Sequence, residues 1–452
     1  MKKINKKLIC ILTGVLLLVL IGVALVLILN WNNIFHSKKD KENDKKPPVT
    51  DVVVEDNVDE GSFDADFISR VWLGGESDTK KPSGGGTSSN IEFDYDPIPE
   101  TEIIYEDKYG KLSATEIIPT LDSKYLKIIG RSASLSEGVA LDYSAATISF
   151  YAVCNERVRV TAEVESSVYF SLYIDGVRQS ERICFTKQSP TQTIAVIKEK
   201  GSHEFELVRE SEMSYGPCTV TKIKLTRGYF EEKPEDKQYY IEFVGDGLTS
   251  GYGALCGFLS NGNSSGVVSE NGITCGGADN LCTGATYSYA YSTAQKIGAD
   301  CSIIAHNGIG FTKCDGMSFQ IKDLYDLESK YRSDSVFSFV DARKPDVVVV
   351  NLGTNDALSG RNDNSIKSQF NNLVKRIRNG YDDQNLKIVF VTGLMGDSKT
   401  NAIKKLVEDK NDDNMYHIDI SAGTSGHGGR PSYLEHNNAA EVLSEFIKSI
   451  LT

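Results

Sequence analysis

Apolar and polar positions alternate regularly over the C-terminal half of the chain. After Gly228, short apolar runs typical of buried strands are separated by stretches in which apolar residues recur at helical spacing. The predicted strands are 240–245, 301–305, 345–351, 386–392 and 415–420. The predicted helices are 285–296, 366–378, 401–409 and 434–450. This order predicts an α/β fold: a doubly wound parallel sheet with helices on both faces, in a flavodoxin-like three-layer arrangement.

The pattern differs between Leu126 and Gly228. Here the runs are short, rich in β-branched or aromatic residues, and roughly alternating between apolar and polar positions. Turn residues such as Asp175-Gly176 and Lys200-Gly201 separate them. The predicted strands are 146–151, 158–162, 168–174, 192–197 and 203–208. Several short strands at this spacing predict an all-β sandwich.

Residues 8–29 are apolar apart from Thr13, and about 22 such residues suffice to cross a bilayer as a helix. Lysines precede this run, which favours a cytoplasmic N-terminus and an extracytoplasmic remainder. The run is long for a signal peptide, and no small-residue cleavage site follows it. We therefore expect an uncleaved transmembrane anchor, with a cleaved signal peptide as the alternative.

A polar segment separates this anchor from the predicted folded parts. It contains Lys/Asp/Glu runs and a Pro-, Gly- and Ser-rich stretch, a composition that cannot bury enough apolar surface to offset the entropy of ordering. The predicted regions are a cytoplasmic stub and anchor (1–36), a disordered linker (37–118), a jelly-roll β-sandwich (119–232) and an α/β domain (233–452).

The net charge of −13 argues against binding to nucleic acid or to an anionic membrane surface. Nine cysteines are present, one of them, Cys10, in the apolar N-terminal run. The sequence has no C-x-x-C pair and only six histidines, so we expect no metal site and no cofactor. Disulfides in an extracytoplasmic domain and buried free thiols both remain open for the other eight cysteines.

The turn over residues 244–253, Val-Gly-Asp-Gly-Leu-Thr-Ser-Gly-Tyr-Gly, follows the first predicted parallel strand. With serine in place of Gly247, it would match the nucleophile turn of the SGNH (GDSL) hydrolases. Gly308 in Asn-Gly-Ile-Gly and Asn355 in Asn-Leu-Gly-Thr-Asn-Asp match two further motifs of these enzymes, in the correct order. All three residues fall after strands, where ligands bind in such sheets.

Residues 120–452 resemble carbohydrate esterase family 2, in which a jelly-roll domain precedes an SGNH domain that removes acetyl groups from sugars. The matching segments are 129–131, 173–176, 201–203, 209–212, 245–253, 307–310, 351–356 and 430–436. The resemblance implies an oxyanion hole at Gly308 and Asn355. It also implies that Asp246, Tyr252 and Asp356 contact the substrate.

The same resemblance implies that the catalytic residues are replaced. Gly247 stands at the nucleophile position and Arg430 at the position of the catalytic histidine, while His436 matches a second histidine on the last helix. His427 or Gly428 stands where the family has an acidic residue, and His427 is a possible substitute base. Ester cleavage of this kind needs a hydroxyl and a neighbouring imidazole, and a guanidinium cannot accept a proton.

Two neighbouring hydroxyls do not offer an obvious replacement. Thr249 and Ser250 enter the following turn and are expected to point away from position 247. The only tryptophans, Trp31 and Trp72, lie outside the predicted folded domains. An aromatic platform for sugar would have to come from tyrosines, for which the candidates are Tyr169, Tyr173, Tyr215 and Tyr252.

We therefore predict a membrane-anchored, extracytoplasmic esterase-like protein that has lost its chemistry and binds or scaffolds a cell-envelope glycan. Its expected partners are a polysaccharide and, through one N-terminal helix, the membrane, with no nucleic acid. One alternative is an active polysaccharide O-deacetylase with an atypical nucleophile. Another is a protein-interaction module.

Overall fold

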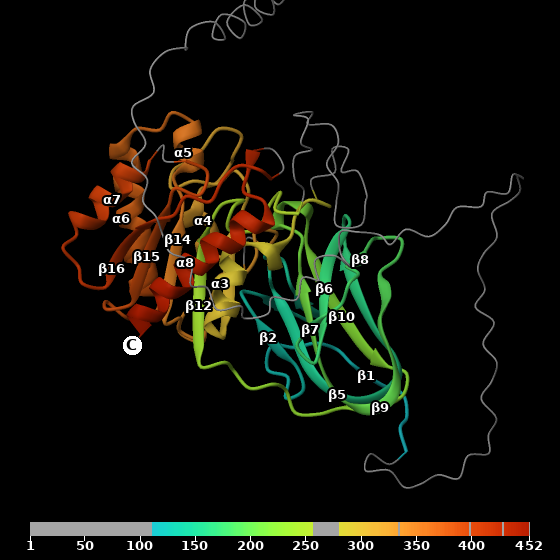
Figure 1. The fold of residues 1–452 in the computed structure, drawn as a ribbon. Helices are drawn as coiled ribbons and strands as arrows, with labels where there is room; N and C mark the ends of the chain where they lie inside the picture. The colour runs from blue at the N-terminus through green and yellow to red at the C-terminus, as the bar shows by residue number, and fades with distance from the viewer. Residues whose placement is uncertain (1–110, 256–279, 333–334, 397–398, 427–428, 452) are drawn as a thin grey trace, which may run out of the picture. The chain divides into compact units, whose positions relative to one another are not determined.

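The computed structural model describes residues 111–255, 280–332, 335–396, 399–426 and 429–451 (Figure 1). The chain divides into two units, Met1–Asp66 and Phe67–Thr452, and all described residues belong to the second. The predicted anchor and residues 37–110 of the predicted linker lie outside the described residues. Within the described ranges, no helix is both long and apolar enough to span a membrane.

The α/β part is built on a parallel sheet of five strands, ordered β13-β12-β14-β15-β16. The strands are β12 (Tyr239–Gly245), β13 (Ala299–Ala305), β14 (Val347–Asn351), β15 (Lys387–Thr392) and β16 (Met415–Asp419). The chain runs from β12 to one neighbour and then returns to the other, so the direction of winding reverses at β12. Ligands bind beyond the carboxyl ends of the strands at such a reversal, which here is Gly245.

Helices cover both faces of this sheet (Figure 1). They are α3 (Tyr289–Ile297), α6 (Asp363–Gly380), α7 (Thr400–Glu408) and α8 (Tyr433–Leu451). Because side chains alternate along a strand, Val348 and Val350 of β14 pack in one core with α6 and α7. Val347 and Val349 pack in another core with α3 and α8. The predicted α/β fold is thereby confirmed.

Three features of the α/β part were not predicted. The helix predicted over 285–296 is interrupted at Ser288, which ends the 3-10 turn η2 (Ala285–Tyr287) and caps α3 by accepting a hydrogen bond from the Tyr291 N–H. Two short helices, α4 (Ile321–Tyr325) and α5 (Thr354–Leu358), have too few residues to show a helical period in the sequence.

The region before it is an antiparallel sheet of eleven strands, which confirms the predicted β-rich domain. Its short strands are β1 (Thr115–Ile117), β2 (Lys127–Ile129), β3 (Ala133–Leu135), β4 (Gly138–Ala140), β6 (Val168–Ile174), β7 (Val177–Arg178), β8 (Ile183–Phe185), β10 (Cys218–Leu225) and β11 (Gly228–Phe230). Phe150, Phe170, Phe185 and Phe205 are fully buried in its core. β1 pairs with β10, so the predicted linker ends in an ordered strand.

The prediction of four separate strands over 146–162 and 192–208 was wrong. These residues form two long strands, β5 (Thr147–Val164) and β9 (Thr191–Arg209), which pair with each other along their length. The register shifts between Cys154 and Glu156, and Glu156 has a φ of 109°. A bulge of this kind bends a strand without ending it, so the polar residues at the bend resembled a turn.

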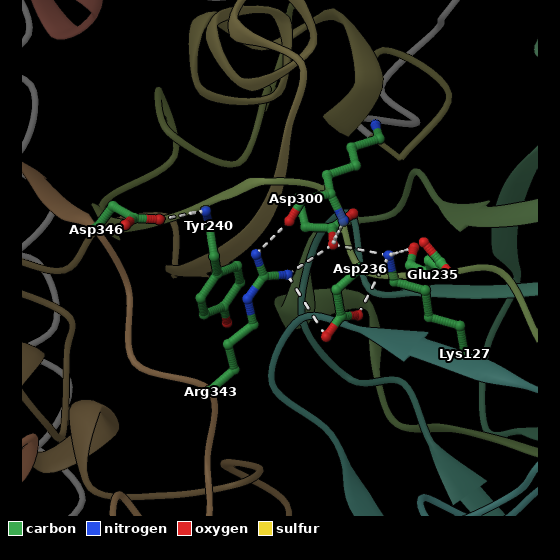
Figure 2. Close-up of polar contacts among 8 residues, drawn as sticks. Lys127, Glu235, Asp236, Tyr240, Asp300, Arg343 and Asp346 are labelled. Carbon is green, nitrogen blue, oxygen red and sulfur yellow. Dashed lines mark hydrogen bonds and ion pairs between the residues drawn. The ribbon is translucent and has the colours of Figure 1, made fainter. Parts of the chain in front are cut away.

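A buried ionic network joins strand β2 to the amino ends of the parallel strands (Figure 2). The Lys127 ammonium lies 2.8 Å from the Asp300 carboxylate, and Arg343 lies 2.9 Å from the same oxygen. Nearby, Arg131 lies 3.1 Å from Glu242, and both side chains are 1% exposed. The two sheets are therefore linked by charged groups, most of which are buried, whereas Arg343 is 31% exposed.

The segment Arg209-Glu210-Ser211-Glu212 makes a second link, close to the carboxyl ends of the parallel strands. The fully buried Arg209 donates hydrogen bonds to main-chain carbonyls, among them Leu141 O at 2.7 Å. Glu210 accepts a hydrogen bond from the Thr286 N–H at 3.0 Å, and Glu212 accepts one from the Asn307 N–H, also at 3.0 Å. A segment of the antiparallel sheet thus holds a loop of the α/β part.

Candidate functional site

The turn that follows β12 is closed by its own backbone. The N–H groups of Thr249 and Ser250 donate to the Asp246 carbonyl, and the Tyr252 N–H donates to the Gly247 carbonyl at 2.8 Å. A Cβ atom on Gly245 would collide with the side chain of Thr249 and lie 2.8 Å from a main-chain oxygen of β14. Gly245 is therefore required by packing, and the turn presents residue 247 at the end of the strand.

Asp246 points into the protein, where it joins two loops. It is 2% exposed; its Oδ1 accepts from the Leu248 N–H at 3.0 Å and its Oδ2 from the Asn355 amide at 2.8 Å. Burial raises the pKa of Asp246 to about 7, although the Leu248 hydrogen bond and the nearby Arg430 charge act in the opposite direction. Both oxygens of Asp246 are engaged within the protein, and its expected substrate contact stays a prediction.

Asn355 lies half-buried in the first turn of the short helix α5. Its side-chain nitrogen donates to Asp246 Oδ2 and also to the Ile309 carbonyl at 2.9 Å. An amide nitrogen has only two hydrogens, so both are committed to protein acceptors. In this arrangement Asn355 connects two loops and offers no further hydrogen to an oxyanion.

The loop that carries Gly308 follows β13. Gly308 has a φ of 85°, a left-handed conformation that glycine adopts without strain. His306 Nδ1 lies 2.8 Å from the Asn307 carbonyl, and its Nε2 lies 2.6 Å from the Lys330 ammonium. Because an ammonium can only donate, His306 accepts at Nε2 and carries its proton on Nδ1. Burial lowers the pKa of Lys330, while the Glu212 carboxylate opposes that shift.

Gly247 and Arg430 meet through the side chain of Asn307. A Cβ atom on Gly247 would lie only 2.6 Å from Asn307 Oδ1 and 3.3 Å from Tyr252 Cβ. Asn307 Oδ1 in turn accepts a hydrogen bond of 3.5 Å from Arg430 Nη2. The Asn307 amide therefore lies where a side chain on residue 247 would project, with Arg430 beside it.

Two tyrosines support the guanidinium. Arg430 Cζ lies 4.6 Å from the centre of the Tyr252 ring, within cation–π distance. Tyr252 stacks on Tyr215 of the 3-10 turn η1 (Met213–Tyr215), with ring centres 6.3 Å apart and an interplanar angle of 6°. Tyr252 is 8% exposed and supports Arg430, and its predicted role as a substrate contact stays a prediction.

The segment before α8 fixes the position of Arg430. The Arg430 carbonyl accepts from the Gly426 N–H at 2.6 Å, and Glu435 accepts from the Ser432 N–H at 2.7 Å, as in a capping box. The Tyr433 N–H donates to the Ala254 carbonyl at 2.8 Å, which ties this segment to the turn after β12. His427 and Gly428, the candidates for a substitute base and for the acidic position, lie outside the described residues.

Comparison with known proteins identifies the family. The family model for GDSL-like lipases and acylhydrolases matches residues 241–445. These residues form a GDSL-like lipase/acylhydrolase domain. It is homologous to the family 2 carbohydrate esterases.

The chain is similar to the cellulase/esterase CelE of Acetivibrio thermocellus, with 26% identity over 321 residues. That alignment covers 67% of this chain and 36% of the relative, so the chain spans about a third of that protein. A family two carbohydrate esterase from Clostridium thermocellum, solved with cellohexaose, has 24% identity and a TM-score of 0.63; the match covers 72% of this chain and 99% of that one. An esterase of the same family from Cellvibrio japonicus has 17% identity and a TM-score of 0.64, covering 75% and 98%.

Asp356 has a structural place in the GDSL-like domain. It is fully buried and accepts hydrogen bonds from the N–H groups of Phe311 and Thr312, both at 2.9 Å, and from the Thr312 hydroxyl at 2.6 Å. The expected substrate contact of Asp356 stays a prediction. Its carboxylate holds the loop that follows Gly310.

The two hydroxyls closest in sequence to Gly247 are both engaged within the protein. The Thr249 hydroxyl lies 2.9 Å from the Tyr289 hydroxyl, and Ser250 Oγ donates to the Gly247 carbonyl at 3.0 Å; both residues are fully buried. Thr249 therefore points toward Tyr289, whereas the Ser250 hydroxyl turns back to the main chain of residue 247. His436 is also fully buried: its Nδ1 accepts from the Tyr289 N–H at 3.2 Å, and burial lowers its pKa to about 4.

The structure shows contacts that the sequence motifs do not indicate. Asn307 is adjacent to a matched glycine, but only the position of its side chain shows that it fills the space beside Gly247. Lys330 and Glu212 reach the Gly308 loop from distant parts of the chain, and no sequence spacing indicates such contacts. Among the described cysteines, Cys154, Cys184, Cys218, Cys301 and Cys314 are free thiols, whereas Cys282 is disulfide-bonded.

Proposed function

We propose that this GDSL-like domain is catalytically degenerate and binds a glycan at the site of the former esterase chemistry. The observation that carries the proposal is the Asn307–Arg430 pair beside Gly247. It places an amide where a nucleophilic side chain would project, and a permanently charged group where a base is required.

The oxyanion-hole residues support the same conclusion. The Asn355 side-chain amide donates one hydrogen to Asp246 and the other to the Ile309 carbonyl. Stabilising an oxyanion with this amide would require breaking one of those hydrogen bonds. Loss of nucleophile and base leaves a residual effect of about 10³-fold over water in a serine hydrolase, well below the ~10⁶-fold that enzymes supply.

Binding of a glycan is supported by the relatives. The Clostridium thermocellum esterase was solved with cellohexaose, and another structural match is an acetyl xylan esterase from Butyrivibrio proteoclasticus. A domain that keeps this fold and its loop arrangement while losing its nucleophile retains a framework for recognising sugars. We extend that role to this chain as a cell-envelope polysaccharide-binding or scaffolding function.

The deciding experiment measures hydrolysis and binding on the same protein. The full-length chain, purified in detergent, is assayed against an acetylated chromogenic ester and tested by affinity electrophoresis in gels that contain envelope and plant cell-wall polysaccharides. We expect hydrolysis at the level of the Gly247→Ala variant, together with retarded migration in at least one polysaccharide. Hydrolysis well above that variant would instead establish the O-deacetylase alternative, with a nucleophile outside residues 247–250.

We further propose that the protein is anchored by residues 8–29 and exposes residues after about 31 outside the cytoplasm. The disulfide-bonded Cys282 supports an oxidising compartment, although five cysteines of the described ranges are free. Protease added to intact cells should release a fragment of about the 120–452 size through cuts in the linker. Protection of the whole chain would contradict this topology.

A further inference from the structure

The outer face of the antiparallel sheet carries a row of cations. Arg157 and Arg159 of β5 point outward, because side chains alternate along a strand and the residues that alternate with these two are buried in the core. Lys222 and Lys224 of β10 point to the same side, and Lys224 is the direct cross-strand partner of Arg159. We call these four side chains the basic face. None of the four is buried.

The charges of the basic face are only partly neutralised. Like charges directly opposite each other on neighbouring strands destabilise a sheet, and Arg159 and Lys224 are placed in this way. Glu116 of β1 lies 3.5 Å from the Lys222 ammonium and 3.8 Å from that of Lys224. Among the contacts of the described residues, no ion pair or side-chain hydrogen bond involves Arg157 or Arg159. The face can therefore accept further carboxylates.

The chain enters the described structure beside the basic face. The described residues begin at 111, and Glu116 of β1 pairs in register with β10. Farther along β5 the outward residue is a carboxylate, Glu163, so the cations lie at the end of the strand that is nearer to β1. Asp107 precedes the first residue of β1 by eight residues. Eight residues reach at most about 28 Å, whereas the distance from β1 across β10 to β5 is about 10 Å.

Residues 91–107, which lie just before the described part of the chain, are strongly acidic. They contain no lysine or arginine, and carboxylates stand at positions 92, 94, 96, 100, 102, 106 and 107. Over 91–96 the carboxylates alternate with Ile, Phe and Tyr, a pattern typical of a strand with one charged and one apolar side. Because the segment is tethered close to the face, its effective concentration there is in the millimolar range. Ion pairs that are individually weak therefore suffice to hold it.

We infer that the basic face binds residues 91–107 of the same chain. Their carboxylates pair with Arg157 and Arg159 and extend the contact that Glu116 makes with the two lysines. The segment belongs to the predicted linker, so docking it shortens the span that remains between the predicted anchor and the folded domains. The inference does not depend on the glycan-binding proposal, since the basic face belongs to the antiparallel sheet and the esterase motifs to the α/β part. An external polyanion can bind this face only by displacing the segment.

Hydrogen exchange measured by mass spectrometry tests the inference on the full-length chain in detergent. After correction for intrinsic rates, we expect the amides of residues 91–107 to exchange about 10-fold more slowly than those of residues 51–66. The second stretch is also acidic but lies far from β1 in the sequence, so it serves as an internal control. The protection should disappear in about 1 M salt, because salt screens exposed ion pairs.

Arg157→Gln/Arg159→Gln removes two cations of the basic face without breaking an ion pair among the described residues, and it should abolish most of the protection. The matched control is Lys367→Gln/Lys375→Gln, which lowers the positive charge by the same amount at two exposed positions of α6 and should leave the protection unchanged. Thermal melting of each variant confirms that the domains remain folded. If the arginine variant unfolds, Lys222→Gln takes its place, since Lys222 is 44% exposed and the change should still lower the protection.

Equal exchange of residues 91–107 and 51–66 in the wild type would overturn the inference. Protection that persists in Arg157→Gln/Arg159→Gln or in about 1 M salt, or that is lost equally in the α6 control, would also contradict it. If the segment is unprotected and a gel containing an anionic polysaccharide retards the wild type more than the arginine variant, the face binds an external polyanion and the inference is wrong.

Discussion

Gly247 and Asn307 share one space: a Cβ atom on Gly247 would lie 2.6 Å from the Asn307 side-chain oxygen. The Arg430 guanidinium donates a hydrogen bond to that same oxygen. Introducing a side chain at position 247 therefore also affects Asn307 and Arg430. The new side chain displaces the Asn307 amide, which then loses its contact with Arg430.

The first prediction tests the proposed loss of esterase chemistry. Gly247→Ser alone and Arg430→His alone should remain inactive, because a hydroxyl without a base and a base without a hydroxyl both fail to attack an ester. Gly247→Ser/Arg430→His should hydrolyse a small acetyl ester measurably. Adding Asn307→Ala should raise that rate further, because it empties the space that the serine needs.

Gly247→Ala/Arg430→His is the matched control, since it adds the same Cβ atom without a hydroxyl. Catalytic residues act as a unit, so the expected signature is non-additive: activity only when serine and histidine are both present. A wild-type rate equal to that of the Ser/His variant would refute the proposal that the domain is catalytically degenerate. A folded but inactive triple variant would show that further parts of the site have changed.

The second prediction uses two buried groups whose effects on stability oppose each other. Burial raises the pKa of Asp246 from 3.8 to about 7, so the stability due to its neutral form is lost as pH rises through that window. Burial lowers the pKa of His436 from 6.5 to about 4, so the stability due to its neutral form is lost as pH falls through that window. Between about pH 4 and about pH 6.5, the two contributions largely cancel.

Each substitution removes one of the two opposing contributions. It should therefore expose the pH dependence of stability that is due to the other group. In Asp246→Asn, the free energy of unfolding should rise with pH by up to about 1.4 kcal/mol per unit; in His436→Asn, it should fall with pH by a similar amount. Both substitutions also lower the free energy of unfolding by an amount that does not depend on pH. The measured quantity is therefore the slope of the unfolding free energy against pH, obtained from urea unfolding at several pH values. The charges near these groups, Arg430 and Asp356 for Asp246 and Glu435 for His436, are unchanged in the comparison. Parallel slopes in the two variants would contradict the prediction.

The sequence correctly predicted those elements whose apolar and polar pattern lies within one short stretch of the chain. The parallel strands were found to within two residues at either end, because each is an apolar run bounded by polar loops. The break at Ser288 was missed because its hydroxyl caps a helix from inside an otherwise helical pattern. The bend of β5 and β9 was missed because it depends on pairing between residues about forty positions apart along the chain.

Prediction of the candidate site was limited in the same way, because side-chain contacts there join distant parts of the chain. Motif order correctly indicated that the Gly247, Gly308 and Asn355 loops converge, since these loops follow neighbouring strands of the sheet. The direction of each side chain was not encoded in the motifs. Asp246 and Asp356 turn inward to hold loops, because main-chain and amide donors there need acceptors once they are buried.

The third prediction tests the bend in β5. Glu156 is a non-glycine residue at a φ of 109°, a conformation that costs about 1 kcal/mol or more for residues with a Cβ atom. Glu156→Gly should therefore keep or raise stability in urea unfolding, despite the loss of the exposed ion pair with Arg227 at 3.4 Å. Arg157→Gly, at the next residue of the strand, is the control and should lower stability by about 1 kcal/mol. An equal loss in both variants would show that the bend does not depend on this residue.

The last prediction concerns the buried pair Arg131 and Glu242. The Glu242 carboxylate lies 3.1 Å from the guanidinium and also accepts hydrogen bonds from the hydroxyls of Tyr325 and Tyr381. Glu242→Leu leaves a buried cation and two hydroxyls without this acceptor, and should cost about 3–5 kcal/mol of the free energy of unfolding. Glu242→Gln keeps an acceptor oxygen and should cost less.

Glu116→Gln is the control, because Glu116 is 52% exposed and its ion pairs with Lys222 and Lys224 lie in solvent. Such surface pairs contribute about 0–1 kcal/mol, so this change should be close to neutral in the same urea unfolding experiment. Since Arg131 follows β2 and Glu242 lies in β12, the loss in Glu242→Leu should also separate the unfolding of the two sheets into distinct transitions. A single transition, with the free energy of unfolding lowered by less than about 1 kcal/mol, would mean that the Arg131–Glu242 pair does not couple the two sheets.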